Sequence, residues 1–359
     1  MSGGLPGYLA ALIRGHGPLT VAGYMAEALG NPRYGYYTSR DPFGADGDFI
    51  TAPEVSQMFG EMLGAWCAAV WQIMDRPDPV NLVEFGPGRG TLMADALRAA
   101  GRAPGFLAAA RIHMIETSTL LRAKQQAALG GHDASWWTRF EEVADGPVLI
   151  VANEFFDALP IRQFERQADG WHERLIDVAG ETDELRFVLN KLVKSDLTPG
   201  TWSDAPIGAV GEVSPAGDAV AEAIGARIAR FGGAALIIDY GSAEGGARET
   251  LQAVRRHGRH GVLDEPGQAD ICAHVDFSQV AAAARRSGAR VVGPIEQGKF
   301  FDAIGIGARA DALRKAHPGD AKEIDSALDR LTSAAQMGSL FKVLAITEGG
   351  HALPGFEAP

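Results

Sequence analysis

Three glycines at alternating positions form the part of this 359-residue chain whose spacing best suits ligand binding. Gly86, Gly88 and Gly90 follow an apolar run that ends at Phe85, and an apolar run with helical spacing begins at Leu92. The pattern predicts a strand, a glycine turn and a helix. Such a turn lets a ligand lie against bare backbone, because glycine has no side chain to block the approach.

The spacing of these glycines favours one ligand class. Turns that bind nicotinamide dinucleotides carry G-x-G-x-x-G, whereas this turn is G-x-G-x-G with an acidic residue two positions before it. This arrangement resembles motif I of class I S-adenosylmethionine (SAM) methyltransferases, so we expect SAM, with NAD as the disfavoured alternative. The expected cofactor-binding residues of the motif are Glu84, Gly86, Pro87, Gly88, Arg89, Gly90 and Thr91. Arg89 either pairs with the methionyl carboxylate of SAM or forms a surface ion pair.

An acidic residue also ends the next predicted strand. Glu116 follows a strand predicted near residues 111–115 and, with Thr117, is predicted to bind the cofactor. A carboxylate at this place can accept hydrogen bonds from both hydroxyl groups of a ribose. The alternative is that Glu116 only caps the helix that follows.

Polar residues follow two further apolar runs that read as buried strands. Asn153 and Glu154 come directly after residues 148–151, Asp157 is three positions further on, and Asp239 ends another apolar run. Because ligands bind at the carboxyl ends of parallel strands, we expect these residues at the site. The alternatives are that Glu154 and Asp157 occupy the first turn of a helix, where they suit its dipole, and that Asp239 caps a turn.

The elements that position these residues indicate an α/β fold. Strand and helix patterns alternate from residue 80 onward, which predicts a doubly wound, Rossmann-like sheet. A third strand is expected near 136–140, inserted β-hairpins near 163–215, a long loop over 240–273, and substrate-side helices near 302–336.

The first part of the chain is expected to form a helical cap over residues 1–79, before the methyltransferase core of residues 80–359. Residues 35–56 are rich in Gly, Tyr and Asp, which suggests a lid over the cofactor. Tyr36 in this segment either contacts the substrate or adenine or is buried. Thr51-Ala-Pro-Glu54 has the spacing of a capping box.

Composition excludes several classes of protein. The net charge of −12 and the pI near 5.2 argue against nucleic acid as a partner. Cys67 and Cys272 are far apart, and the histidines form no H-E-x-x-H motif, so we expect neither a disulfide framework nor a metal. No apolar run is long enough to span a membrane. Without a signal or transit pattern the expected location is cytoplasmic; the oligomeric state is left open.

Several separated motifs resemble the MidA family of SAM-dependent methyltransferases. They are Glu84-Phe-Gly-Pro-Gly-Arg-Gly-Thr-Leu92, Gly47-Asp-Phe-Ile-Thr-Ala-Pro-Glu-Val-Ser56, Asn153-Glu-Phe-Phe-Asp-Ala-Leu-Pro160, Ala273-His-Val-Asp-Phe277 and Met337-Gly-Ser-Leu-Phe-Lys-Val-Leu344. The resemblance implies a class I fold with a helical N-terminal region, SAM as cofactor and a protein substrate. Mitochondrial members assist assembly of respiratory complex I and symmetrically dimethylate an arginine of the subunit that lines its quinone site, which implies a related activity here.

A second resemblance concerns the substrate. Arginine methyltransferases place Ser-Glu after the corresponding strand, and that glutamate holds the guanidinium; Asn153 and Glu154 are similar and are implied to be catalytic. Gln163 stands where those enzymes have a second glutamate, with Glu165 two positions further on, so the second residue that holds the guanidinium is left open. His274 resembles a histidine of their substrate-side loop and is implied to be catalytic. The substrate-binding residues predicted in total are Tyr36, Asp157, Gln163 and Asp239. The alternatives are a SAM-binding assembly chaperone with little turnover and, disfavoured, an NAD(P) oxidoreductase.

Overall fold

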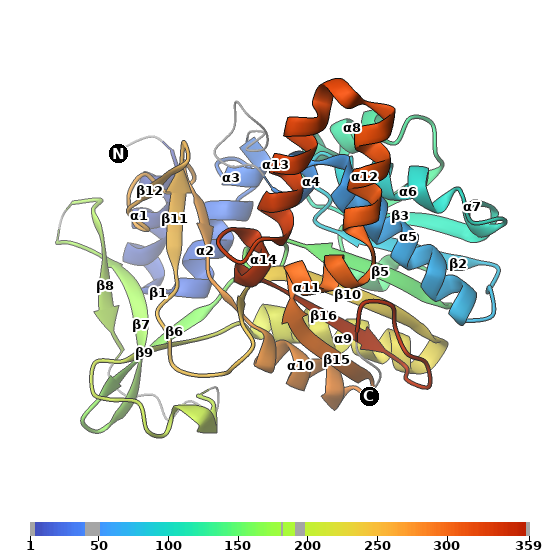
Figure 1. The fold of residues 1–359 in the computed structure, drawn as a ribbon. Coiled ribbons are helices and arrows are strands. Elements are labelled where there is room, and N and C mark those ends of the chain that lie inside the picture. Colours follow the sequence, from blue (N-terminus) through green and yellow to red (C-terminus); the bar gives the residue numbers. More distant parts are fainter. Residues whose placement is uncertain (1–3, 40–50, 181, 191–197, 357–359) are drawn as a thin grey trace. The chain divides into compact units, whose positions relative to one another are not determined.

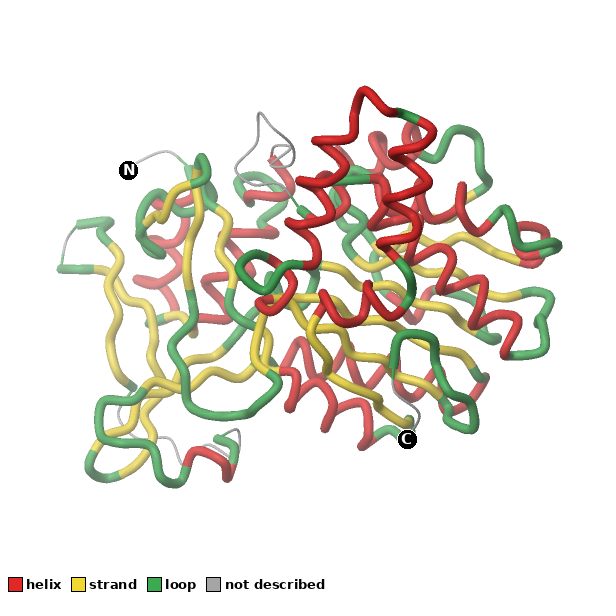
Figure 2. Tube along the Cα trace, in the orientation of Figure 1, coloured by secondary structure: helices red, strands yellow, loops and turns green. Residues whose placement is uncertain are grey.

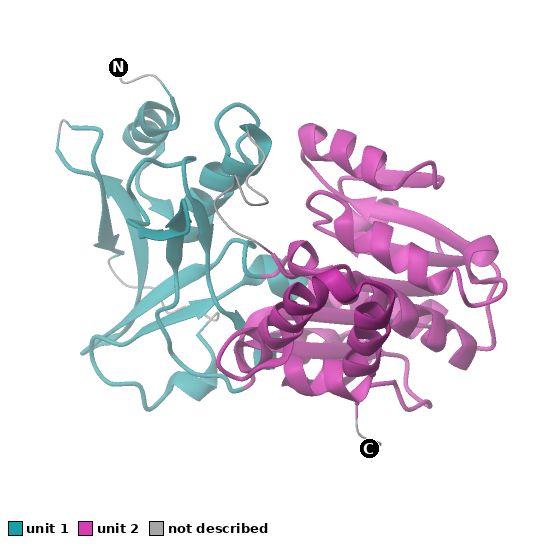
Figure 3. Cartoon of the chain, turned by 45° about the horizontal axis from the view of Figure 1, so that its top comes forward, with its two compact units in different colours: residues 1–49, 157–219, 244–279 teal, residues 50–156, 220–243, 280–359 magenta. Residues whose placement is uncertain are grey.

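The computed structural model describes residues 4–39, 51–180, 182–190 and 198–356 (Figures 1 and 2). The chain forms two compact units, each built from three segments (Figure 3). Unit 1 comprises residues 1–49, 157–219 and 244–279, and unit 2 comprises residues 50–156, 220–243 and 280–359. The helical region expected over residues 1–79 is therefore shared between the two units. Residues 40–50 of the expected lid lie outside the described residues.

Unit 2 contains a mostly parallel sheet. Its strands are β2 (Val80–Phe85), β3 (Ala110–Ile115), β4 (Ala134–Trp137), β5 (Val148–Asn153), β10 (Gly233–Ser242), β15 (Arg290–Glu296) and β16 (Phe341–Thr347). They follow the order β15-β16-β10-β5-β2-β3-β4, in which β16 is antiparallel to both of its neighbours and the pairs from β10 to β4 are parallel. The predicted doubly wound sheet is confirmed, and the third strand expected near 136–140 is β4. The order reverses between β2 and β5, and ligands bind at such a point.

Helices lie on both faces of this sheet (Figure 1). Ala234, Leu236 and Ile238 of β10 join one core cluster with α5 and α6. Ala235 and Ile237 alternate with them, are also buried, and face the other side, where Figure 1 shows α9 and α10. The helices of unit 2 are α4 (Ala52–Val55), α5 (Gln57–Ile73), α6 (Thr91–Ala100), α7 (Phe106–Ala109), α8 (Thr119–Ala128), η1 (Phe140–Glu142), α11 (Gln297–Ala303), α12 (Ile306–Ala316), η3 (Pro318–Asp320), α13 (Ala321–Thr332) and α14 (Met337–Leu340), while α9 (Pro215–Phe231) and α10 (Phe277–Arg286) cross the boundary between the units.

Glycines allow α5 to approach α6 closely. Gly60 and Gly64 lie one helical turn apart on α5. A Cβ atom at Gly64 would lie 2.1 Å from the carbonyl oxygen of Ala96, and one at Gly60 would lie 2.7 Å from the Cβ of Asp95. Because α6 begins directly after the glycine turn, this contact holds the helix that starts at the candidate site.

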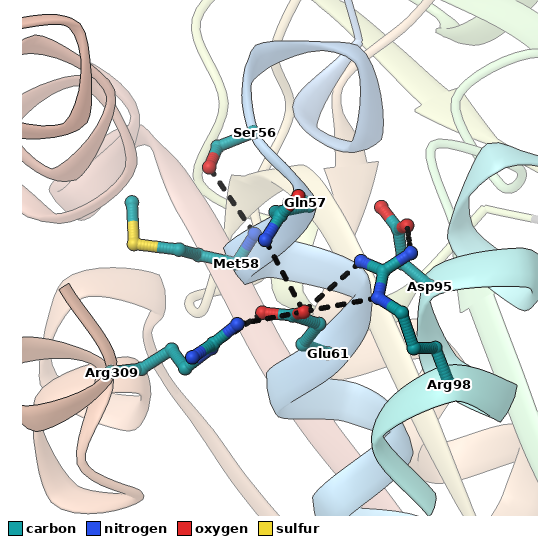
Figure 4. A network of polar contacts seen from close by, with 7 residues as sticks. All are labelled: Ser56, Gln57, Met58, Glu61, Asp95, Arg98 and Arg309. Atoms are coloured by element: carbon teal, nitrogen blue, oxygen red, sulfur yellow. Dashed lines mark hydrogen bonds and ion pairs between the residues drawn. The ribbon is translucent and has the colours of Figure 1, made fainter. Parts of the chain in front are cut away.

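A buried carboxylate ties α5 to two other helices (Figure 4). Glu61 accepts hydrogen bonds from Arg98 on α6 at 3.0 Å and from Arg309 on α12 at 2.6 Å. Arg98 also pairs with Asp95 at 2.7 Å, and Gln57 donates to Glu61 at 3.4 Å. Figure 4 shows that the two guanidinium groups approach Glu61 from opposite sides, so the carboxylate links three helices.

Replacing Glu61 by alanine is expected to lower the free energy of unfolding by about 2–3 kcal/mol, within the range for hydrogen bonds to charged groups, because Arg309 and Arg98 lose the carboxylate that they share. The matched control is Glu222→Ala. Glu222 pairs with Arg286 at 2.8 Å, but the two side chains are 45% and 54% exposed, and such a pair contributes less than about 1 kcal/mol. Urea denaturation measures the free energy of unfolding of both variants. An equal loss in the two would contradict the stabilising role of the buried Glu61 carboxylate.

Acid should remove the difference between wild type and Glu61→Ala. Burial would raise the pKa of Glu61, but hydrogen bonds from Arg309 and Arg98 lower it overall. The pKa of Glu61 in the folded protein is therefore below its value in the unfolded chain, which is about 4.3 for a glutamate. The stabilisation is complete above that value and is lost as the pH falls through the folded-state pKa.

Unit 1 is built from short antiparallel strands and N-terminal helices. Its elements are α1 (Leu5–His16), β1 (Leu19–Thr20), α2 (Val21–Gly30), α3 (Tyr36–Ser39), β6 (Arg162–Gln167), β7 (Gly170–Val178), β8 (Leu185–Leu189), η2 (Gly200–Trp202), β9 (Val210–Val213), β11 (Gln252–Arg255), β12 (Gly258–His260), β13 (Asp270–Cys272) and β14 (Val275–Asp276). β6, β7 and β8 pair as antiparallel hairpins, which confirms the hairpins expected in the insertion.

The long loop expected over residues 240–273 is wrong. β11, β12 and β13 form a small antiparallel sheet in that segment. β11 and β12 are joined by Arg256 and His257, whose φ angles are 49° and 61°. A two-residue hairpin turn requires such left-handed residues and usually has Asn or Gly there. Arginine and histidine carry no turn signal, so the hairpin is not evident from the sequence.

Candidate active site

The turn after β2 has the backbone that its glycines permit. The φ angles of Gly86, Gly88 and Gly90 are 60°, 54° and 84°, all in the left-handed region that disfavours other residues. A Cβ atom at Gly86 would lie 3.0 Å from the Phe155 ring, and one at Gly90 would lie 3.0 Å from the Cα of Gln125. Gly86 is exposed, so bare backbone faces outward at the switch point of the sheet.

Two buried carboxyl groups lie beside this turn. Glu84 is the penultimate residue of β2, and its Oε2 has no hydrogen-bond partner among the described residues. Burial and the nearby Glu116 carboxylate raise the pKa of Glu84 to about 8, against a hydrogen bond from the backbone of Met93. Glu84 therefore keeps its proton at neutral pH, which removes the repulsion between the two groups.

Glu116 follows β3 and is not the helix cap. Its Oε1 accepts from the backbone N–H of Ser118 at 2.7 Å and its Oε2 accepts from Gln125 at 3.0 Å. Ser118 is the N-cap of α8, since its hydroxyl accepts from the Leu121 N–H at 3.4 Å. Burial raises the pKa of Glu116, and the hydrogen bonds oppose that rise. Thr117 beside it is exposed.

The short helix α4 joins the glycine turn to the loop after β5. Its Glu54 accepts a hydrogen bond from the Thr91 hydroxyl at 2.6 Å and lies 3.9 Å from a guanidinium nitrogen of Arg89. Its Ala52 donates a backbone N–H to Glu154 at 2.9 Å. The expected capping box is wrong, because the Thr51 side chain makes no cap and Glu54 turns to α6 instead. Glu54 thus contacts the glycine turn through Thr91 and Arg89, which its local spacing does not indicate.

Glu154 adopts a backbone conformation that is rare for glutamate. Its φ is 48°, and no helix follows β5 at this point, so the helix-dipole interpretation is wrong. Its Oε1 accepts from Ala52 and, at 3.2 Å, from the side-chain amide of Asn153. Strained residues concentrate at functional sites. The Oδ1 of Asn153 is buried and has no hydrogen-bond partner in the part of the chain that the structure describes.

Asp239 holds the loop that carries Glu154. It is fully buried, and its carboxylate accepts from the backbone N–H groups of Phe155 at 3.2 Å and Phe156 at 3.0 Å. Phe155 in turn packs on Phe85, with ring centroids 5.3 Å apart. These contacts suit a positioning role for Asp239 rather than the direct substrate contact that the sequence suggested.

The other predicted substrate residues belong to unit 1. Tyr36 is fully buried in the core of that unit. Asp157 accepts a backbone hydrogen bond from Ala273 at 3.0 Å. Gln163 donates to Glu212 at 2.8 Å, and its buried Oε1 has no hydrogen-bond partner among the described residues. His274 is exposed.

Glu212 on β9 was not foreseen from the sequence. It accepts from Gln163 and from the backbone of Thr250 and Leu251, both at 3.0 Å. The backbone N–H of His274 donates to the Thr250 hydroxyl at 2.8 Å. Although the His274 residue is exposed, desolvation by the groups around its ring lowers its pKa; the Glu212 carboxylate opposes that shift, and Arg248 adds to it. An acidic residue thus lies beside Gln163.

The residues after β2 and β3 fit SAM. Bare backbone at Gly86, the unpartnered buried oxygen of Glu84 and the carboxylate of Glu116 suit a ligand with a nucleoside and polar groups. Residues 62–295 match a family model described as "Putative S-adenosyl-L-methionine-dependent methyltransferase". The chain belongs to this family.

Known proteins resemble this methyltransferase over nearly its whole length. Protein arginine methyltransferase NDUFAF7, mitochondrial, of Danio rerio is 37% identical over 94% of this chain and 86% of its own. The Drosophila melanogaster homolog of that protein, also named mitochondrial, is 38% identical over 97% and 85%. A crystal structure of a Burkholderia thailandensis protein bound to S-adenosyl-homocysteine superposes with a TM-score of 0.85 at 29% identity, covering 98% and 93%.

These findings confirm the class I methyltransferase fold, SAM as cofactor and the MidA resemblance. They contradict the expected cytoplasmic location, because both animal relatives are named mitochondrial; a missing targeting pattern was insufficient evidence for a destination. Within the described residues, no helix of this methyltransferase is long and apolar enough to cross a membrane. The same residues contain no cluster of His, Cys, Asp and Glu suited to a metal ion.

Proposed function

We propose that this chain methylates an arginine side chain of a protein, with SAM as the methyl donor. The observation that carries the proposal is Glu154, a glutamate held in a left-handed conformation at the end of β5 and linked through α4 to the glycine turn. The proposal is also supported by two similar proteins, because the Danio rerio and Drosophila melanogaster relatives are named protein arginine methyltransferases.

In this proposal the cofactor is held by the turn after β2 and by Glu116. Gly86, Gly88 and Gly90 expose backbone, Glu84 offers a protonated carboxyl, and Glu116 accepts hydrogen bonds from the ribose hydroxyls. Bound SAM supplies an electrophilic methyl group on a sulfonium. Arg89, Thr91 and Glu54 shape the turn through their contacts with one another. The remaining cofactor-binding candidates are Pro87 in the glycine motif and Thr117 beside Glu116.

The substrate role falls to Glu154. A guanidinium stays protonated in proteins, and a carboxylate binds it through charge-assisted hydrogen bonds that fix its orientation. Asn153 donates to Glu154, and Asp239 fixes the following loop. Asp157 and Gln163 remain the proposed further substrate contacts, and His274 remains the further catalytic candidate. Tyr36 is buried in the core of unit 1, so its side chain packs in that core instead of contacting substrate.

The experiment that tests the proposal uses a protein lysate from a strain that lacks the gene. Incubation with purified enzyme and SAM carrying a labelled methyl group is expected to label arginine, and mass spectrometry locates it. Label on lysine or on small molecules only would overturn the arginine assignment. Following the MidA resemblance, we further propose symmetric dimethylation of a complex I subunit at the quinone site, which the same spectra test.

Replacing Glu116 by glutamine keeps its shape and removes its charge. The affinity for S-adenosylhomocysteine is expected to fall by about 1–3 kcal/mol, the range for hydrogen bonds to a charged group. Isothermal titration calorimetry measures the change, with Glu141→Gln as control, because Glu141 is exposed. Unchanged affinity in Glu116→Gln would exclude the ribose role.

A further inference from the structure

Gln125 on α8 is a fully buried amide that connects the two parts of the cofactor site. Its Nε2 donates to the carbonyl oxygen of Gly88 at 2.9 Å and to Oε2 of Glu116 at 3.0 Å. Its Oε1 accepts from the indole N–H of Trp136 on β4 at 2.8 Å. The amide thus contacts the glycine turn, the end of β3 and the neighbouring strand.

The direction of these hydrogen bonds is fixed by Trp136. An indole N–H can only donate, so it selects the carbonyl oxygen of the amide. Both N–H groups of Gln125 then point toward the two acceptors, Gly88 and Glu116. A side chain that is buried with each of its polar groups satisfied is held in one orientation.

We infer that Gln125 is a positioning residue for cofactor binding, which holds the Glu116 carboxylate and the glycine turn at a fixed separation. The inference rests on the proposed ribose role of Glu116. The backbone around Gln125 adds a second constraint, since a Cβ atom at Gly90 would lie 3.0 Å from its Cα. The turn therefore packs against Gln125 as well as bonding to it.

The same hydrogen bond affects the charge of Glu116. Glu116 faces Glu84 from β2 and Arg122 from α8. Burial raises the pKa of Glu116, while hydrogen bonds from the Ser118 N–H and the Gln125 amide lower it. Removing the amide donor leaves more Glu116 protonated at a given pH. Because a protonated carboxyl loses acceptor capacity, cofactor affinity should then fall off at a higher pH than in wild type.

The test is the affinity for S-adenosylhomocysteine, measured by calorimetry across the pH range in which the protein stays folded, with the pH dependence of wild type compared with that of each variant. Gln125→Met keeps the volume and removes the donors. We expect about 10- to 100-fold weaker binding at neutral pH, as for loss of a hydrogen bond to a charged group, and a midpoint shifted to higher pH. Trp136→Phe frees the Gln125 amide to rotate and should cause a smaller loss of affinity and a smaller shift of the midpoint in the same direction. If Gln125→Met does not fold, Trp136→Phe tests the positioning role of Gln125 in its place.

The matched control is Gln297→Met. Gln297 on α11 is also fully buried, and it donates to the carbonyl oxygen of Leu331 at 2.8 Å. Its replacement should lower stability without changing affinity or the pH midpoint. If Gln125→Met and Trp136→Phe bind with the affinity and midpoint of wild type while Glu116→Gln binds weakly, the inference on Gln125 is overturned. If Glu116→Gln itself binds normally, the ribose assignment of the proposed function fails instead.

Discussion

Glu154→Gln is expected to reduce the rate of methyl transfer by about 10²- to 10⁴-fold, equivalent to roughly 3–5 kcal/mol at the transition state. The amide keeps the shape of the side chain and loses the charge that binds a guanidinium. Affinity for S-adenosylhomocysteine should change by less than about threefold, because the turn after β2 and Glu116 are untouched. Single-turnover kinetics with labelled SAM and calorimetry measure the two effects separately.

Glu265→Gln is the matched control for this variant. Glu265 is also a glutamate in the left-handed region, with a φ of 41°, and it pairs with Arg255 at the surface. The same chemical change on the same backbone conformation should leave the rate unaltered. Equal rates for wild type and Glu154→Gln would exclude Glu154 from the reaction. A partner protein that assembles normally with either form, without methylation, would instead favour a chaperone that binds SAM.

Gly88→Val is expected to abolish measurable cofactor binding. Gly88 has a φ of 54°, and a branched side chain there would occupy the space in which a ligand approaches the backbone. The strained conformation alone costs on the order of 1–2 kcal/mol for a residue with a Cβ. This strain lowers stability, whereas the loss of binding requires in addition that the valine side chain blocks a ligand that lies against this turn.

Gly130→Val separates strain from exclusion. Gly130 has a φ of 59°, and the nearest atom to a Cβ there is a carbonyl oxygen 4.0 Å away. Both variants should lose similar thermal stability, whereas only Gly88→Val should lose binding of S-adenosylhomocysteine. Normal binding by Gly88→Val would place the cofactor elsewhere.

The sequence reveals the site residues that belong to short, contiguous motifs. The turn at Gly86 to Gly90 and the acidic residues Glu84 and Glu116 lie at the ends of segments predicted to be strands, and the ends of parallel strands meet at one edge of a sheet. The backbone at Glu154 was not foreseen. A left-handed glutamate depends on hydrogen bonds from distant residues such as Ala52, which no local pattern records.

Residues with roles set by tertiary contacts were missed. Glu54 has a plausible local partner in Thr51, yet its carboxylate binds Thr91, which is 37 positions away. Gln125 lies on an unremarkable stretch of α8, and only the structure brings it to Glu116 and Gly88. Glu212 contacts Gln163 across 49 positions through the pairing of β6 with β9. Each is a polar residue whose sequence neighbours predict only a helix or strand.

The position of β16 in the sheet has a consequence for synthesis of the chain. Residues Phe341–Thr347 insert between β10 and β15, so Ala234–Tyr240 obtain their second set of backbone partners only from the last part of the chain. The last segment of unit 1 ends at residue 279, so all of unit 1 is synthesised before the strand that completes the sheet of unit 2. Until it arrives, β10 presents an apolar unpaired edge, the kind of surface that recruits other strands. A nascent or prematurely terminated chain is therefore most exposed to aggregation at β10, far in sequence from the missing residues.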